Sequence, residues 1–281
     1  MRPSRIAPLL LVLAASLSAA PRRIVSLSPT LTEILYGIGA FPEVVGVSEY
    51  STYPPEAARL PSLGGWATPD LEKMLSLRPD LVVLDDAQAP LFQDQARTLG
   101  FHLLTVPSHN IAQVYGAIET LGRATGHDAA AARLAAEMRA GLDRIAGRTA
   151  ALPKPSVVLI VDRTPGTLRD LYTVTKGGYL AELIEIAGGR IAAAPASIGY
   201  SRLSKEDLLA INPDVILDFN HGPAAGGLSA NPLDAWREMP ELKAVRGRHV
   251  YSVTEEYVPH ASQRMVLTAE LFARLLHPEA K

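Results

Sequence analysis

The sequence predicts an α/β protein of two lobes, each with a mostly parallel β-sheet flanked by helices, joined by a single long α-helix. Three observations lead to this prediction. A helix–proline–strand segment occurs twice, strand and helix patterns alternate in both halves of the chain, and a long helix-favouring stretch separates the halves. Strands that alternate with helices of about ten residues are typical of parallel sheets.

The duplicated segment lies at residues 72–84 and 206–218, so that Glu72 corresponds to Glu206 at a constant offset of 134 positions. Each copy begins as a short amphipathic helix, stops at a proline and continues as a run of Val, Ile and Leu. A helix normally ends before a proline, and an unbroken apolar run suits a strand buried on both faces. The duplication predicts two matching lobes with a cleft between them, where a ligand can bind.

The first half of the chain alternates between strand and helix patterns. Ser28 is a candidate N-cap with Pro29 at the first helical position, and Thr30 with Glu33 offers an alternative capping box. The expected elements are strands at 23–27, 44–47, 81–84 and 102–106, and helices at 29–38, 70–77 and 89–99.

Two helices are expected between the halves. Apolar residues at helical spacing predict the first at 111–125, which Gly126 ends. The second, at 128–149, is rich in Ala, Arg, Glu and Leu, and at about 1.5 Å per residue it would reach about 33 Å, which makes it a stiff connector. The second half is expected to contain a strand at 157–161, an irregular stretch at 163–176, a helix at 178–187, the second repeat at 204–218, a loop at 220–232, a strand at 249–253 and a helix at 259–276.

The first 20 residues are predicted to be a secretory signal peptide. Two arginines precede a mostly apolar stretch at 6–17, which is too short to span a bilayer, and small residues follow at 18–20. The chain has no cysteine, so an exported product must be held together by its core rather than by disulfides. The predicted organisation is a signal peptide at 1–20, an N-terminal lobe at 21–124, a connecting helix at 125–152 and a C-terminal lobe at 153–281.

Composition and motifs argue against several classes of function. Without the two signal arginines, 25 Lys and Arg remain against 29 Asp and Glu, and this net charge of −4 favours neither nucleic acid nor an anionic membrane as partner. The sequence has no G-x-S-x-G, H-E-x-x-H or G-x-x-x-x-G-K-[ST] motif, and its seven histidines include no i, i+4 pair. We expect no catalysis, no resident metal and no cofactor. A remote alternative is a secreted hydrolase that uses Asp85, Asp86, Glu255 and Glu256 as acid and base.

Aromatic residues gather in the loops where a ligand is expected. Ligands of parallel α/β sheets bind at the carboxyl ends of the strands, and the chain has only nine Tyr and two Trp. Aromatic faces with a few charges suit a large flat or macrocyclic ligand, although rings in loops also brace those loops. The candidate loops are 28–29, 50–53, 64–66, 85–86, 163–172, 200–202, 220–221 and 255–264, and their rings are Tyr50, Tyr53, Trp66, Tyr172, Tyr200 and Tyr257.

A family resemblance extends over the chain beyond the signal peptide. It is carried by Arg23-Ile-Val-Ser-Leu-Ser28-Pro29 with Thr32-Glu33, by Tyr53-Pro54-Pro55-Glu56, and by Gly64-Gly65, Arg78-Pro79-Asp80, Ala187-Gly188-Gly189, Pro213-Asp214, Trp236 and Arg264. These segments resemble the periplasmic cobalamin- and iron-complex-binding proteins of ABC importers. The resemblance implies two α/β lobes joined by one long helix, a shallow hinge and a ligand held between the lobes. We interpret Trp236 as a core residue.

The resemblance also implies roles for particular residues. Glu72 and Glu206 match paired surface glutamates that dock on arginines of the membrane permease, whereas the plainer alternative is that each only complements the dipole of its helix. Four residues align with aromatic and arginine positions of cobalamin-binding members, namely Tyr50, Trp66, Tyr200 and Arg264. Two positions differ from those members: Tyr200 replaces a tryptophan, and Asp85-Asp86 lie where a second tryptophan is usual. With the loop residues added, the predicted ligand-binding set is Ser28, Pro29, Tyr50, Trp66, Asp85, Tyr200, Tyr257 and Arg264.

The resemblance ranks the possible ligands. Haem-binding relatives carry an iron-ligating tyrosine immediately before the equivalent of Trp66, where this chain has Gly65, so haem is disfavoured. Siderophore-binding members often line the cleft with arginines. Here Arg163, Arg169, Lys176, Arg202 and Arg264 could serve, but Asp85, Asp86, Glu255 and Glu256 oppose a strongly anionic ligand. A histidine, either His221 or His260, could coordinate a metal centre within the ligand.

These inferences combine into one predicted function. The protein is expected to be a monomeric periplasmic receptor that captures a corrinoid and delivers it to an ABC permease dimer in the inner membrane. The absence of a lipidation cysteine favours a free periplasmic protein. A ferric-siderophore receptor is the main alternative, and an adaptor that keeps the receptor fold without transporting is a third class.

Overall fold

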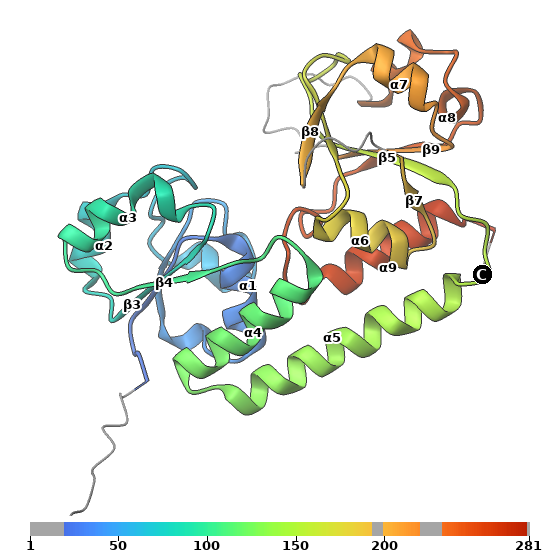
Figure 1. Cartoon of the computed structure of the whole chain (residues 1–281). Coiled ribbons are helices and arrows are strands. Elements are labelled where there is room, and N and C mark those ends of the chain that lie inside the picture. The colour runs from blue at the N-terminus through green and yellow to red at the C-terminus, as the bar shows by residue number, and fades with distance from the viewer. Residues whose placement is uncertain (1–19, 193–198, 220–231, 280–281) are drawn as a thin grey trace, which may run out of the picture.

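The computed structural model describes residues 20–192, 199–219 and 232–279. Two α/β lobes stand side by side, and the helix α5 (Asp128–Thr149) runs beneath both of them (Figure 1). The predicted fold class is therefore confirmed, including the single long helix that joins the lobes. No helix in the described ranges is both long and apolar enough to span a bilayer.

The N-terminal lobe is a four-stranded, fully parallel sheet in the order β2–β1–β3–β4. Its strands are β1 (Ile24–Ser26), β2 (Val44–Val47), β3 (Leu81–Asp85) and β4 (Leu103–Val106). Side chains of β3 alternate between two apolar clusters, because successive residues of a strand point to opposite faces. One face is covered by α1 (Pro29–Gly37) and α4 (Ile111–Thr125), and the other by α2 (Leu71–Leu77) and α3 (Ala89–Thr98).

The C-terminal lobe has a mixed sheet in the order β10–β9–β5–β6–β8, and β7 (Arg190–Ile191) also pairs with β5. The parallel part consists of β5 (Ser156–Asp162), β9 (Val215–Phe219), β10 (Val250–Val253) and the short β7. The strands β6 (Leu171–Val174) and β8 (Tyr200–Leu203) pair antiparallel. One face is covered by α6 (Tyr179–Ile186) and α9 (Met265–Leu276), and the other by α7 (Lys205–Ile211), α8 (Lys243–Arg246) and the 3₁₀ turn η4 (Pro232–Glu238).

Three sequence-based expectations about local structure are wrong. The stretch 163–176, expected to be irregular, contains β6 (Leu171–Val174), and the expected loop 200–202 belongs to β8 (Tyr200–Leu203). These two antiparallel strands are short, and β8 is an exposed edge with a charged side chain, so neither has the apolar signal of a central strand. The last helix begins at Met265 rather than near residue 259.

The duplication is visible in hydrogen bonds as well as in sequence. Asp80 Oδ2 accepts bonds from the backbone N–H groups of Arg22 and Arg23 at 2.8 and 3.0 Å. Its counterpart Asp214 Oδ2 accepts bonds from the N–H and Oγ of Ser156 at 2.9 and 2.7 Å. In the N-terminal lobe, Asp80 therefore ties β3 to the residues just before β1. In the C-terminal lobe, Asp214 ties β9 to the start of β5. The two preceding helices both end on a residue in the left-handed region.

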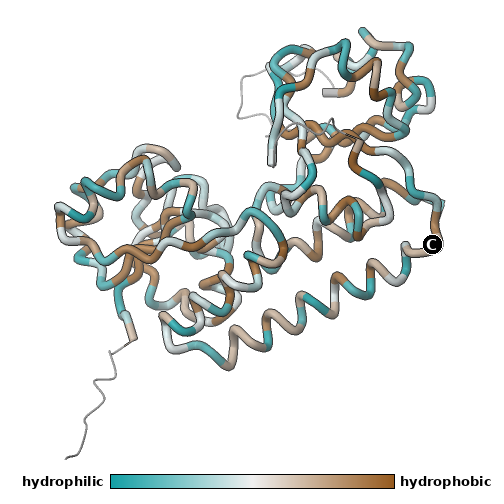
Figure 2. Tube along the Cα trace, in the orientation of Figure 1, coloured by the Kyte–Doolittle hydropathy of each residue, from teal (hydrophilic) through white to brown (hydrophobic). Residues whose placement is uncertain are grey.

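The core is continuous from one lobe to the other. A single cluster of buried side chains contains Ile34 of α1, Met138, Leu142 and Ile145 of α5, and Phe272 of α9. Apolar residues follow the strands of both sheets, with polar residues on the outer turns (Figure 2). Because α5 packs against helices of both lobes, bending at the junction would disturb close-packed side chains.

Candidate ligand-binding cleft

Segments that follow β1 and β4 in the N-terminal lobe contact segments that follow β6 and β10 in the C-terminal lobe. The segment after β4 contacts the start of α6, where the Tyr179 N–H donates to the His109 carbonyl at 2.8 Å. In the same region the Ile111 N–H donates to Glu182 Oε2 at 2.7 Å. These contacts mark the interlobe junction, the region between the carboxyl-end loops of the two sheets, where the sequence predicts a ligand-binding cleft.

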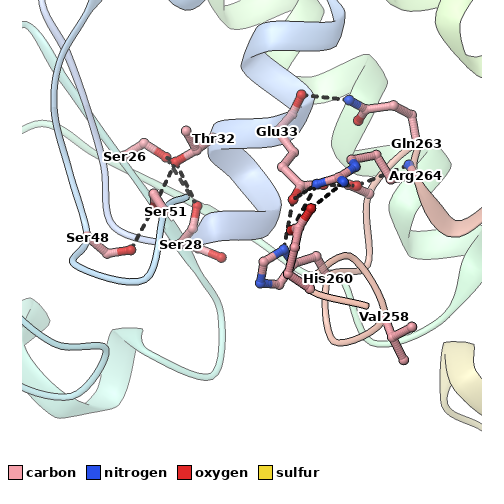
Figure 3. Close-up of polar contacts among 12 residues, drawn as sticks. Ser26, Ser28, Thr32, Glu33, Ser48, Ser51, Val258, His260, Gln263 and Arg264 are labelled. Atoms are coloured by element: carbon pink, nitrogen blue, oxygen red, sulfur yellow. Dashed lines mark hydrogen bonds and ion pairs between the residues drawn. The ribbon is translucent and has the colours of Figure 1, made fainter. Parts of the chain in front are cut away.

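A buried glutamate of α1 holds the two lobes together at this cleft (Figure 3). Glu33 is 1% exposed, and its carboxylate lies 2.7 Å from His260 Nδ1 and accepts a hydrogen bond from Ser262 Oγ. Its backbone carbonyl accepts a bond from Gln263 Nε2 at 2.8 Å. Glu33 does not form the capping box that the sequence offered, because α1 begins after Ser28 and the side chain turns to the other lobe.

Arg264, a predicted ligand contact, is engaged in the same junction. Its guanidinium lies 3.2 Å from Glu33 Oε1 and 2.5 Å from Glu256 Oε1, and it stacks 4.0 Å from the ring centroid of Tyr53. It also lies 5.3 Å from the ring centroid of Tyr257, another predicted contact. Burial opposes the charge, but the hydrogen-bonded carboxylates raise the pKa of Arg264, so the cation is permanent. Residues before α9 remain non-helical where they make these contacts.

A cluster of hydroxyl groups fixes the loop that carries Tyr50. Thr32 Oγ1 lies 2.8 Å from Ser26 Oγ and 3.2 Å from Ser51 Oγ, and Ser51 Oγ lies 2.9 Å from Ser48 Oγ (Figure 3). All four side chains are buried. The predicted contact Ser28 is 4% exposed, and its carbonyl accepts a bond from Thr32 Oγ1, while Pro29 is partly exposed.

Three aromatic side chains of the predicted set remain accessible. Tyr50 is 56% exposed, Tyr200 53% and Trp66 39%. The buried Gln88 donates from Nε2 to the carbonyl oxygens of Leu27 and Trp66, at 2.9 and 3.0 Å, and so ties the Trp66 loop to the sheet. Rings on fixed loops can contact a ligand with little loss of conformational entropy.

An apolar pocket of about 330 Å³ lies at the carboxyl ends of β5 and β9. Tyr200 and Tyr172 contribute from the antiparallel strands, and Val258 contributes from the loop that also carries His260. Its remaining lining residues are Leu159, Val161, Asp162, Leu180, Phe219 and Pro259. Tyr200 therefore belongs to a formed apolar surface in the C-terminal lobe.

Two groups of histidine and carboxylates, which sequence spacing did not reveal, have geometry that could hold a metal ion. In the first, Asp85 is buried and accepts a bond from Ser108 Oγ at 2.5 Å, while Asp86 Oδ1 lies 2.8 Å from His109 Nε2. Burial raises the pKa of Asp85, against the opposing effect of its hydrogen bonds. The second group is Glu33, Glu256 and His260. The carboxylates in both are already paired, which also weakens the hydrolase alternative.

Most of the arginines considered for an anionic siderophore are neutralised. Arg163 is buried against Asp218, with Nη2 at 2.8 Å from Oδ2, and Arg202 pairs with Asp170. Asp218 also accepts a bond from Trp236 Nε1 at 2.8 Å, and Trp236 is 2% exposed, which confirms its interpretation as a core residue. The candidates Asn220 and His221 lie outside the described residues.

The predicted docking residues occupy equivalent exposed positions. Glu72 lies in the first turn of α2 and Glu206 in the first turn of α7, and both are exposed. Each helix covers the sheet face opposite the one that packs toward α5, so α2 and α7 lie on corresponding outer faces of the lobes (Figure 1).

Comparison with known proteins places this architecture in a family. A sequence profile of the family described as periplasmic binding protein matches residues 24–257. An uncharacterized ABC transporter substrate-binding lipoprotein, YvrC of Bacillus subtilis, is 29% identical over 92% of this chain and 81% of its own length. The structure of the periplasmic vitamin B12 binding protein BtuF of Vibrio cholerae is 27% identical with a TM-score of 0.76, covering 92% of this chain and 97% of that one. The periplasmic heme-binding protein RhuT of Roseiflexus sp. RS-1 is 26% identical with a TM-score of 0.79, covering 92% and 99%.

The chain belongs to the periplasmic binding protein family. It is the substrate-binding component of an ABC transporter, a class of protein that works with a membrane permease and an ATPase. Its neighbours include both vitamin B12-binding and heme-binding proteins, so the fold is compatible with more than one large ligand.

Proposed function

We propose that this protein captures a corrinoid of the cobalamin type in the interlobe cleft and delivers it to an ABC permease. The observation that carries the proposal is the contrast between accessible rings and neutralised cations. Tyr50 and Trp66 are exposed on loops of the N-terminal lobe and Tyr200 is exposed at the start of β8 in the C-terminal lobe, whereas Arg163, Arg202 and Arg264 are paired with carboxylates. Such a cleft favours a large, mostly uncharged macrocycle over a strongly anionic iron complex.

The likeness to vitamin B12-binding proteins supports the same ligand class. The test is calorimetric titration of the purified protein, without its first 20 residues, with cyanocobalamin, a ferric hydroxamate siderophore and haemin. We expect saturable binding of cyanocobalamin with Kd of about 1 µM or tighter. Saturable binding of haemin or the siderophore, with no heat from cyanocobalamin, would refute the corrinoid assignment.

Single substitutions test whether the rings form the site. We expect Tyr50→Ala and Tyr200→Ala each to weaken cyanocobalamin binding by about tenfold, since an aromatic contact contributes on the order of 1 kcal/mol. Tyr115→Ala is the matched control, because Tyr115 lies on α4 and stacks with Arg139 away from the cleft. An equal loss of cyanocobalamin affinity in all three variants would indicate a general folding defect and would contradict a binding role for Tyr50 and Tyr200.

Delivery would use the paired glutamates at the outer faces of the lobes. Two carboxylates at equivalent places complement a two-subunit permease, and exposed charges mainly set orientation and association rate. Glu72→Gln with Glu206→Gln should slow association with the cognate permease–ATPase complex and leave cyanocobalamin affinity unchanged. An unchanged association rate at low salt would favour the plainer explanation, in which each glutamate only complements its helix dipole.

Export and a monomeric state complete the proposal. Residues 1–20 would be removed during secretion, and the mature protein would act in the periplasm as one copy per ligand. Mass spectrometry of the mature N-terminus and sedimentation of the ligand-bound protein test these two points.

A further inference from the structure

Each lobe exposes a leucine beside its docking glutamate. Leu75 on α2 is 42% exposed and Leu209 on α7 is 46% exposed, and the two are separated by the same 134 positions as the duplicated glutamates. Each leucine follows its glutamate by three positions, which places the two side chains on one face of the helix. The neighbouring residues Met74 and Leu208 are fully buried and anchor the helices to the lobes. Packing within the protein therefore explains why Met74 and Leu208 are apolar, but it does not explain why Leu75 and Leu209 are.

The charges around the two leucines leave the glutamates available. On α2, Lys73 Nζ donates to the Ser62 carbonyl at 2.7 Å, and on α7, Lys205 Nζ pairs with Glu238 at 2.6 Å. Asp207 is held by the N-cap Ser204. Within the described ranges, neither Glu72 nor Glu206 forms an ion pair within its own lobe.

We propose that Leu75 and Leu209 are the apolar anchors of the permease-docking surface, the surface that they form with Glu72 and Glu206. The partner is a two-subunit membrane permease that presents, on each subunit, a basic side chain beside an apolar depression. This inference rests on the proposed function. Single exposed leucines are common on protein surfaces, but here exposure recurs at the same repeat position beside an available carboxylate in both lobes.

The glutamates and leucines would contribute differently to docking. Exposed charges act mainly on the association rate and lose strength in salt, whereas desolvated apolar contacts act mainly on the dissociation rate. A surface with one contact of each kind per lobe would first orient the receptor and then retain it. The pseudo-symmetry of the two patches matches a partner made of two equivalent subunits.

The test measures binding of the mature protein to its cognate permease–ATPase complex in lipid nanodiscs by surface plasmon resonance, at 50 and 500 mM NaCl. Leu75→Gln and Leu209→Gln should each raise the dissociation rate by about fivefold, and the double variant by at least about twentyfold, at both salt concentrations. The association rate and the affinity for cyanocobalamin should remain within twofold of wild type. The matched control is the double variant Leu99→Gln and Leu267→Gln, which alters two exposed leucines outside the docking surface and should leave both rates unchanged.

Distinct outcomes separate this inference from the proposed function. If wild type binds the complex and the Leu75/Leu209 double variant dissociates within twofold of wild type, the inference is overturned and the proposed function stands. The inference is also overturned if the control variant loses as much affinity as the double variant. If wild type itself does not bind the complex, the proposed delivery function and the inference are refuted together. Circular dichroism of each variant checks that the substitutions leave the fold intact.

Discussion

Replacement of Glu33 by glutamine should destabilise the junction between the lobes without changing the size of the side chain. The Glu33 carboxylate is buried and interacts with three groups from the loop before α9, on His260, Ser262 and Arg264. Removing one partner of a buried ion pair typically costs 3–5 kcal/mol, because the remaining charge is left uncompensated. Arg264 would keep its second carboxylate, on Glu256, and glutamine can still accept one hydrogen bond. We therefore expect the lower end, about 3 kcal/mol in the free energy of unfolding.

Equilibrium urea unfolding followed by circular dichroism measures this effect. The matched control is Glu256→Gln, which neutralises the other carboxylate on the same guanidinium but at an exposed position. Exposed ion pairs contribute about 0–1 kcal/mol, so the control should change stability by no more than that. If Glu33→Gln lowered the free energy of unfolding no more than Glu256→Gln, the inference that the buried carboxylate holds the lobes together would be wrong.

Three further predictions concern stability. Trp236→Phe should lower the free energy of unfolding by about 1–3 kcal/mol, because buried Asp218 would lose one hydrogen-bond donor; a loss below 0.5 kcal/mol by urea unfolding would contradict this. Gly122→Ala should lower the melting temperature, because its Cβ would lie 2.5 Å from an alanine Cβ of α5, whereas Gly116→Ala on the same helix meets open space and should raise it. Asp214→Asn should reduce stability at pH 7, and the difference from wild type should shrink as pH falls below about 4. A hydrogen-bonded lysine and Ser156 at the start of β5 hold the pKa of Asp214 well below its ordinary value, so its contribution is present above the unfolded-state pKa and is lost through the folded-state pKa. A constant difference across that pH range would refute the assignment.

Local patterns in the sequence were sufficient to predict the architecture. The duplicated Pro-Asp motif marks the same structural event in both lobes, since Asp80 and Asp214 each tie a strand to the start of its neighbour. The connecting helix is confirmed over Asp128–Thr149, because helix propensity and apolar spacing agree throughout it. Such features depend on residues close together in the chain, where periodicity is informative.

The interlobe junction was harder to predict, because it depends on residues far apart in the chain. Glu33 and Ser262 are 229 positions apart, and no spacing rule connects them. The local pattern of Thr30 with Glu33 predicts a capping box and gives no sign that the Glu33 side chain contacts the other lobe. Similarly, β6 and β8 each acquire strand structure from the other, and their short, partly polar sequences have no strong signal of their own.

The junction also determines what kind of motion can accompany binding. A continuous core passes through α5, the buried Glu33 carboxylate joins α1 to the loop before α9, and a backbone hydrogen bond joins His109 to Tyr179. Wide opening would have to break all three, at the cost of exposing apolar surface and a buried charge. If the proposed function holds, these contacts keep the two lobes in a nearly fixed arrangement before the ligand binds, and Tyr50 and Tyr200 would then contact it with little entropy cost for assembling the site. In such a receptor, the permease would distinguish the ligand-bound from the ligand-free form by contact with the ligand itself and by small shifts of the lobes. The distance between the two proposed docking helices, α2 and α7, would stay nearly constant.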